Sequence, residues 1–152
     1  MQPPRPEIAT GVIGSEGPEQ TEAVAARLAG ELEPGDVVLI AGGLGAGKTT
    51  FVRGAARALG VDEPVTSPTF TIGQRYSGRV AVSHLDLYRL AEGAGLAGED
   101  PGLLEDYLTD DAIAFVEWPE VAEGFIAEPA AVVEIRHAGG DRRAIEITRR
   151  GS

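Results

Sequence analysis

The chain has 152 residues, 43% of them hydrophobic, which suits one folded domain and argues against disorder of the whole chain. It contains no cysteine, which excludes a disulfide scaffold, a zinc–thiolate site and a thiol nucleophile, and its formal net charge of −11 argues against direct, non-specific nucleic-acid binding. No apolar run approaches membrane-spanning length and the N-terminus lacks a signal-peptide core, so we expect a cytoplasmic protein without membrane contact.

The N-terminal part of the chain predicts a tail, an edge strand and a helix. Residues 1–7 contain three prolines and predict a flexible tail, followed by a single domain over residues 8–150. A short edge strand is expected over residues 8–14. The next segment has apolar residues at four-residue spacing, with Pro18 in its first turn, and predicts a helix that ends at Gly30 or at the Pro-Gly turn after it.

The middle of the chain predicts a buried strand, a second helix and a hairpin. Residues 36–43 are apolar without polar alternation, a pattern typical of a strand buried on both faces in a parallel sheet. Residues 48–60 predict a helix that ends at a glycine. Residues 66–90 predict a β-hairpin that turns at Ser77-Gly78.

The C-terminal part predicts a helical stretch, one more buried strand and a hairpin. Residues 103–108 read as helical, and residues 112–118 as a buried strand that is stopped by Pro119. Residues 130–150 predict a hairpin around Gly139-Gly140. The order of these elements predicts an α/β fold with a mainly parallel central sheet, helices on both faces and antiparallel strands at the edges.

One motif carries a specific chemistry. Gly42-x-x-x-x-Gly47-Lys48-Thr49 lies between the buried strand and the helix, which is the context of the phosphate-binding loop of P-loop NTPases. In such a loop the backbone N–H groups converge on phosphate oxygens, Lys48 reaches the β- and γ-phosphates, and the Thr49 hydroxyl binds Mg²⁺. Lys48 is the only lysine among 13 basic residues. The predicted nucleotide contacts in this loop are Gly43, Leu44, Gly45, Ala46, Gly47, Lys48 and Thr49.

Two carboxylates are candidates for the rest of the site. Glu117 ends a buried strand, and we favour a role in holding Mg²⁺ over a plain solvated strand end. By strand alternation, Asp86 shares a face with His84 and Tyr88. Asp86 is a second acidic contact of Mg²⁺, a group that orients the attacking water, or a surface carboxylate paired with Arg89, and the pattern leaves these alternatives open.

The other polar candidates each have an ordinary alternative. Ser67 and Thr69 flank a proline, and they form either a loop that senses the γ-phosphate or a plain turn. His84 and His137 are interpreted as structural or surface residues. The arginines of residues 141–150 are interpreted as a device that keeps an edge strand soluble.

Four motifs together resemble one family. "GGLGAGKTTF", "SPTFTI", "HLDLYRL" and "FVEWPE", in this order and spacing, resemble the TsaE (YjeE) family over about residues 8–137. This family comprises small bacterial ATPases of tRNA threonylcarbamoyladenosine biosynthesis. The resemblance implies ATP and Mg²⁺ as ligands. It also implies that the chain works with the TsaD and TsaB proteins, which carry the chemistry on tRNA.

The resemblance also implies roles for individual residues. Lys48 and Thr49 match the phosphate and Mg²⁺ contacts, Glu117 the metal-site glutamate and Asp86 the essential aspartate. The segment from Ser67 to Thr69 matches a switch. Thr50 matches a second threonine of the loop, and Trp118 the tryptophan beside the nucleotide.

The mechanism that we expect is attack of water on the γ-phosphate of ATP. Lys48 and Mg²⁺ would stabilise the charge, and Asp86 or Glu117 would orient or deprotonate the water. We expect weak activity without partner proteins, because no arginine finger is evident. A small-molecule P-loop kinase is the main alternative. A GTPase is disfavoured, because the segment that recognises guanine normally contains a lysine, and the single lysine of this chain is already in the phosphate-binding loop. A non-catalytic adaptor that binds a nucleotide remains an open alternative.

Overall fold

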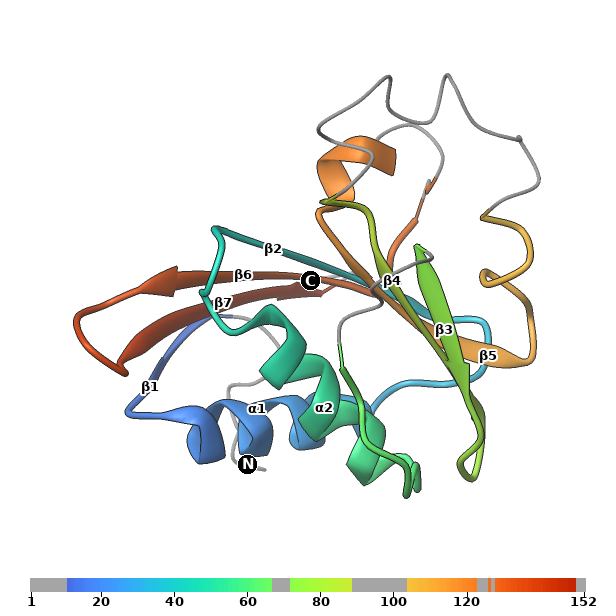
Figure 1. Cartoon of the computed structure of the whole chain (residues 1–152), viewed down its shortest axis with the longest axis horizontal. Helices are drawn as coiled ribbons and strands as arrows, with labels where there is room; N and C mark the ends of the chain where they lie inside the picture. The colour runs from blue at the N-terminus through green and yellow to red at the C-terminus, as the bar shows by residue number, and fades with distance from the viewer. Residues whose placement is uncertain (1–10, 67–71, 89–103, 123–125, 127, 150–152) are drawn as a thin grey trace, which may run out of the picture.

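The computed structural model describes residues 11–66, 72–88, 104–122, 126 and 128–149 (Figure 1). Within these ranges no helix is long and apolar enough to cross a membrane. The predicted tail over residues 1–7 lies outside them. The elements are β1 Gly11–Ser15, α1 Pro18–Ala29, β2 Val37–Gly42, α2 Lys48–Ala58, β3 Gly73–Tyr76, β4 Ala81–Asp86, β5 Ala112–Glu117, the 3-10 helix η2 Pro119–Ala122, β6 Ala131–His137 and β7 Arg143–Arg149.

The strands form one seven-stranded sheet in the order β1-β7-β6-β2-β5-β4-β3. The centre is parallel, since β2 pairs with both β5 and β6, and β4 pairs with β5. Both edges are antiparallel, through the predicted hairpins β3–β4 and β6–β7 and through β1 on β7. Three parallel and three antiparallel ladders result, so the sheet of the described residues is mixed rather than mainly parallel.

Both α-helices lie on one face of the sheet (Figure 1). Their apolar side chains pack against each other and against strands β2, β5, β6 and β7. We predicted helices on both faces, and for the described part of the chain this prediction is wrong. The large, fully buried side chains of this cluster are Leu28, Ile40, Phe51, Ile113, Phe115, Ile135, Ile145 and Ile147.

Strands and turns, rather than a helix, contribute the cluster on the opposite face. Its buried members are Ile72, Leu85, Leu87, Leu104 and Val116. Strand β2 therefore has both faces covered, as predicted, but unequally. Val38 and Ile40 are fully buried against the helices, whereas Val37 and Leu39 are only partly buried on the opposite face.

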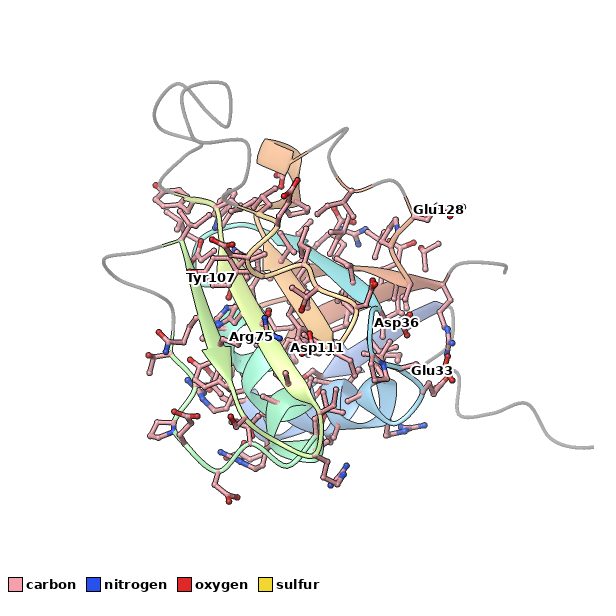
Figure 2. The ribbon with its side chains drawn as sticks, turned by 90° about the vertical axis from the view of Figure 1, so that its right-hand side faces the viewer. Glu33, Asp36, Arg75, Tyr107, Asp111 and Glu128 are labelled. Atoms are coloured by element: carbon pink, nitrogen blue, oxygen red, sulfur yellow. The ribbon has the colours of Figure 1, made fainter. Side chains whose placement is uncertain are left out.

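Residues 104–108, predicted to be helical, form hydrogen-bonded turns instead. The amide of Tyr107 donates to the carbonyl of Leu104 at 3.0 Å, and the chain then straightens toward β5. The segment beyond is tied to β3 by the ion pair of Arg75 with Asp111, 2.8 Å apart (Figure 2). Contacts of the Asp106 carbonyl with Arg75 and of the Tyr107 hydroxyl with the Gly73 carbonyl on β3 hold the segment as turns.

The parallel strands bring three predicted site segments to one edge of the sheet. Strands β2, β4 and β5 end at Gly42, Asp86 and Glu117. In the β4–β5 register Asp86 is the partner of Glu117, and in the β2–β5 register Ile40 is the partner of Glu117. The crevice outside the carboxyl ends of such strands is where open α/β sheets bind ligands.

Candidate functional site

The glycine-rich loop connects the end of β2 to the start of α2. Gly45 and Gly47 have φ angles of 74° and 107°, in the left-handed region that favours glycine. Gly42 is required for a different reason, because a Cβ there would lie 2.6 Å from the Ile135 carbonyl oxygen on β6. The loop therefore turns tightly over the sheet edge, and α2 begins directly at Lys48.

Lys48 lies inside the loop rather than in solvent. Its side chain is buried, and its Nζ donates to the carbonyls of Gly42 and Gly43, each at 2.8 Å. The ammonium also lies 4.4 Å from the ring centroid of Trp118, within the range of a cation–π contact. Burial lowers the pKa of Lys48, while the neighbouring carboxylates, led by Glu117, oppose that shift. The loop thus holds one positive charge at the sheet edge.

Glu117 is 2% exposed and is held from two sides. Its Oε2 accepts a hydrogen bond from Thr49 Oγ1 at 2.9 Å and lies 2.6 Å from Nε2 of His84, which is fully buried. The alternative of a solvated strand end is therefore wrong. The other ring nitrogen of His84, Nδ1, has no hydrogen-bond partner among the described residues. Within the described part of the chain, the polar contact of the ring is therefore the one from Nε2 to Glu117.

Asp86 lies beside Glu117 at the end of the neighbouring strand. Its Oδ1 accepts a hydrogen bond from the Tyr88 amide at 3.1 Å. Burial raises the pKa of Asp86, and the like charge of Glu117 adds to this, while the Tyr88 amide opposes it. Asp86 is thus part of the same cluster rather than an isolated surface carboxylate. Arg89, its proposed surface partner, lies outside the described residues.

Trp118 turns the chain sharply after β5. Its φ angle of 61° is in the left-handed region, which is costly for a bulky residue and is typical of functional sites. Its amide donates to the Ile40 carbonyl at 3.3 Å, and its ring lies 4.8 Å from that of Tyr88. The two rings form an aromatic wall next to the ammonium of Lys48.

These residues surround a cavity of about 310 Å³. Its lining combines the loop, both carboxylates and the aromatic wall, and consists of Leu44, Gly45, Ala46, Gly47, Lys48, Thr49, Thr50, Asp86, Tyr88, Glu117 and Trp118. Gly43, also predicted, contributes its carbonyl to Lys48. Ser67 and Thr69 lie outside the described residues.

The donor set fits Mg²⁺ bound together with phosphate oxygens. The described part of the chain holds no group of three or more His, Cys, Asp or Glu side chains that could hold a metal ion alone. Mg²⁺ normally needs only one or two carboxylates, because substrate phosphates and water complete its octahedron. Glu117, Asp86 and the Thr49 hydroxyl, which donates to Glu117, are the side chains here that could supply such oxygens.

Arg143 is a site residue that the sequence interpretation missed. Its Nε donates to the Ala46 carbonyl at 2.9 Å and its Nη2 to the Gly45 carbonyl at 3.2 Å. We had assigned the arginines of this segment to the solubility of an edge strand. No local sequence pattern indicates the contact of Arg143 with the loop, because only the strand order places the start of β7 beside it. His84, interpreted from the sequence as a structural or surface residue, is fully buried and contacts Glu117.

Comparison with known proteins identifies relatives over most of the chain. The sequence model of the family described as "Threonylcarbamoyl adenosine biosynthesis protein TsaE" matches residues 15–145. The chain is 39% identical over 136 residues to the tRNA threonylcarbamoyladenosine biosynthesis protein TsaE of Bacillus subtilis, covering 89% of this chain and 83% of that protein. It is 36% identical over 124 residues to the protein of the same name in Treponema pallidum, covering 76% and 84%.

A solved structure has the same architecture. The crystal structure of Bacillus subtilis YdiB superposes with a TM-score of 0.76 at 33% sequence identity, and the match covers 93% of this chain and 86% of that one. The matched family region includes the loop, both carboxylates and the first residues of β7.

Proposed function

The chain belongs to the TsaE family of threonylcarbamoyl adenosine biosynthesis proteins, and from this premise we propose that it is a Mg²⁺-dependent ATPase of the P-loop class. We propose that it serves the threonylcarbamoyl modification of adenosine in tRNA, in the cytoplasm, together with the TsaD and TsaB proteins. The observation that carries the proposal is the convergence of Lys48, Thr49 and two carboxylates on one cavity. A cation, a hydroxyl and carboxylates beside a helix N-terminus are what a bound nucleotide–metal pair requires.

Binding of the phosphates falls to the loop and to Lys48. The N-terminus of α2, which follows the loop directly, carries the positive end of the helix dipole and suits phosphate oxygens. Lys48 Nζ donates to two loop carbonyls, and a phosphate oxygen would compete for the same ammonium. A bound Mg²⁺, held through Thr49 and Glu117, would supply neutralisation of the phosphate charge.

Hydrolysis needs a group that orients or deprotonates the attacking water. The water oxygen bonds to the γ-phosphorus, the bond from that phosphorus to the ADP oxygen breaks, and the water proton passes to a carboxylate. Asp86 suits this role, because burial raises its pKa and makes its ionised form a stronger base. Glu117 is already held by Thr49 and His84 and suits the metal.

The described lining of the cavity supports slow turnover by the chain alone. No arginine is among the lining residues that the structure describes, so no arginine finger is available from them. An arginine finger can contribute several orders of magnitude to phosphoryl transfer. The proposal therefore expects stimulation by a partner, which either supplies such a group or orders the site.

One experiment tests the proposal as a whole. ATP hydrolysis by the purified chain is measured alone and with a TsaD–TsaB pair, and tRNA modification is followed in the same tubes. We expect the pair to stimulate hydrolysis and modification to require intact Lys48. If the pair changes neither hydrolysis nor modification, the role in tRNA modification is wrong, and phosphorylation of small-molecule acceptors is then screened.

A further inference from the structure

The hairpin β6–β7 holds three consecutive carbonyls of the glycine-rich loop. His137 Nε2 lies 3.4 Å from the Leu44 carbonyl, Arg143 Nη2 donates to Gly45 at 3.2 Å, and Arg143 Nε donates to Ala46 at 2.9 Å. Arg143 thus makes the two shorter contacts. The loop is therefore restrained by a segment about one hundred residues away in the sequence.

The side chain of Arg143 is itself held in place. Its Nη1 donates to the carbonyls of Gly140 and Arg142, each at 2.8 Å. Gly140 is in the hairpin turn and has a φ angle of 54°. Strand β6 is a parallel neighbour of β2, so its last residue, His137, lies at the sheet edge where the loop begins, and Arg143 is its partner in the register. The fold thus presents a pre-oriented guanidinium to the loop.

Holding a carbonyl also fixes the N–H group of the next residue. The peptide bond is planar and trans, so the N–H of residue i+1 points opposite to the carbonyl of residue i. With the carbonyls of Gly45 and Ala46 directed at Arg143, the N–H groups of Ala46 and Gly47 point away from it. The Ala46 N–H closes the turn onto Gly43 at 3.2 Å. Gly47 is the N-cap of α2, so its N–H lies at the N-terminus of that helix.

Glycine makes this external restraint necessary. Gly45 and Gly47 adopt left-handed angles at no steric cost, but glycine also has access to many other conformations. A loop built from such residues loses much conformational entropy when it orders around a ligand. Two charge-assisted hydrogen bonds from a fixed guanidinium would reduce that loss before the ligand arrives.

We propose that Arg143 is a positioning residue that pre-organises the phosphate-binding loop for the polyphosphate of a nucleotide. The inference rests on the proposed function, because it needs the loop to bind phosphate. Arg143 does not line the cavity of Lys48 and Glu117. It lines a smaller cavity of about 110 Å³ on which Gly45, Ala46 and Gly47 also border. Its effect is therefore on affinity for the nucleotide rather than on the chemical step.

The test compares Arg143→Ala and Arg143→Lys with a matched control, Arg142→Ala. Arg142 is an exposed neighbour in the same hairpin, so the control removes the same charge without touching the loop. ATP affinity is measured by calorimetry, and kcat and KM are measured for ATP hydrolysis. We expect Arg143→Ala to weaken ATP binding about tenfold or more, with kcat at saturating ATP within about threefold of the wild type. Arg142→Ala should bind within about twofold of the wild type.

The lysine variant separates charge from geometry. A lysine restores the charge but cannot donate in the fixed fork of a guanidinium, so it should recover only part of the affinity. If Arg143→Ala does not fold, the lysine variant alone decides the question. A purely structural role would lower the melting temperature and leave the affinity of the folded fraction unchanged, which would overturn the inference.

The inference and the proposed function can fail separately. If the wild-type chain binds ATP and both Arg143 variants bind it equally well, the inference alone is wrong. If the wild-type chain does not bind ATP at all, the proposed function is wrong and the inference fails with it.

Discussion

Glu117 Oε2 accepts a hydrogen bond from Thr49 Oγ1 at 2.9 Å, although the two residues are 68 positions apart in the sequence. The contact joins the end of β5 to the first turn of α2. One carboxylate oxygen therefore meets the hydroxyl that we assign to Mg²⁺ and, on its other side, the ring of His84. Thr49 and His84 thus both contact Glu117. A change in any of these three side chains should therefore affect the Mg²⁺ dependence of hydrolysis more than it affects nucleotide affinity.

Glu117→Gln should separate binding from turnover. The amide keeps the volume of the buried side chain but removes the negative charge that a divalent cation requires. We expect ATP hydrolysis, measured with the TsaD–TsaB pair, to fall by roughly 100-fold, while ATP affinity in calorimetry changes less than about threefold. Glu120→Gln, on the exposed start of η2, is the control. Normal hydrolysis by Glu117→Gln would show that the metal assignment is wrong.

Lys48→Ala should abolish ATP binding while the chain still folds. Among the described residues that line the cavity, Lys48 is the one side-chain cation, and its hydrogen bonds to phosphate would be charge-assisted on both sides. We expect at least about a 100-fold loss of ATP affinity. Arg53→Ala removes an equal charge from the same helix and should bind ATP normally. A Lys48→Ala variant that retains wild-type affinity would remove the basis of the nucleotide site.

His84 should act through Glu117. The ring is fully buried and its Nε2 lies 2.6 Å from the carboxylate, so its loss would free Glu117 to rotate. We expect His84→Ala to lower kcat about tenfold and to raise the Mg²⁺ concentration needed for half-maximal hydrolysis. Metal-free nucleotide affinity should stay unchanged, and His84→Gln, which can still donate, should recover part of the activity.

Ser83→Ala is the matched control for His84. Ser83 is equally buried on β4, and its hydroxyl has no partner among the described residues. It should leave the Mg²⁺ requirement unaltered. If both variants shift the Mg²⁺ requirement alike, His84 acts through general packing of β4 rather than through Glu117.

Asp86→Asn should stabilise the protein in the absence of ligands. Burial raises the folded-state pKa of Asp86 above its ordinary value of 3.8, so the ionised carboxylate destabilises the fold at neutral pH. The free energy of unfolding of the wild type should therefore fall as pH rises from the ordinary pKa to the raised folded-state pKa of Asp86. The variant should lack this component and melt at a higher temperature than the wild type at pH 7, while hydrolysis is lost.

Thermal melts with and without ATP and Mg²⁺ check the Asp86 prediction. Asp62→Asn, at an exposed position, removes the same charge and should not raise the melting temperature. A lower melting temperature for Asp86→Asn at pH 7 would mean that the ionised carboxylate stabilises the fold through Lys48 or the Tyr88 amide more than its burial costs.

The parts of the site that the sequence predicted are those encoded by local pattern. The loop needs glycines at fixed spacing, and Lys48 and Thr49 follow them directly. Glu117 could be predicted because it ends an apolar run, and parallel strands place their carboxyl ends together. The crowding of Asp86 and Glu117 follows from the β4–β5 register, which no short pattern determines.

The parts that were missed depend on long-range order. Arg143 reaches the loop because β7 returns beside β6 at the edge where β2 ends, and a sequence pattern gives strands but not their order. The arrangement of α1 and α2 on one face is likewise set by their packing on each other. Residues 104–108 have helical spacing, but they are held as turns by contacts with β3.

Gly54→Ala should destabilise the contact between the two helices. A Cβ at Gly54 on α2 would lie 2.5 Å from the Cα of Glu22 on α1, which is backbone and cannot move aside without shifting the helix. The gain in helix propensity is at most about 1 kcal/mol, so overpacking should dominate and lower the free energy of unfolding by about 2 kcal/mol. Chemical denaturation measures this directly. Gly14→Ala, on an exposed part of β1 with open space around it, should change stability by less than about 0.5 kcal/mol. Equal stability of the two variants would mean that α1 and α2 can move apart without cost, despite the close approach of Gly54 to the Glu22 backbone.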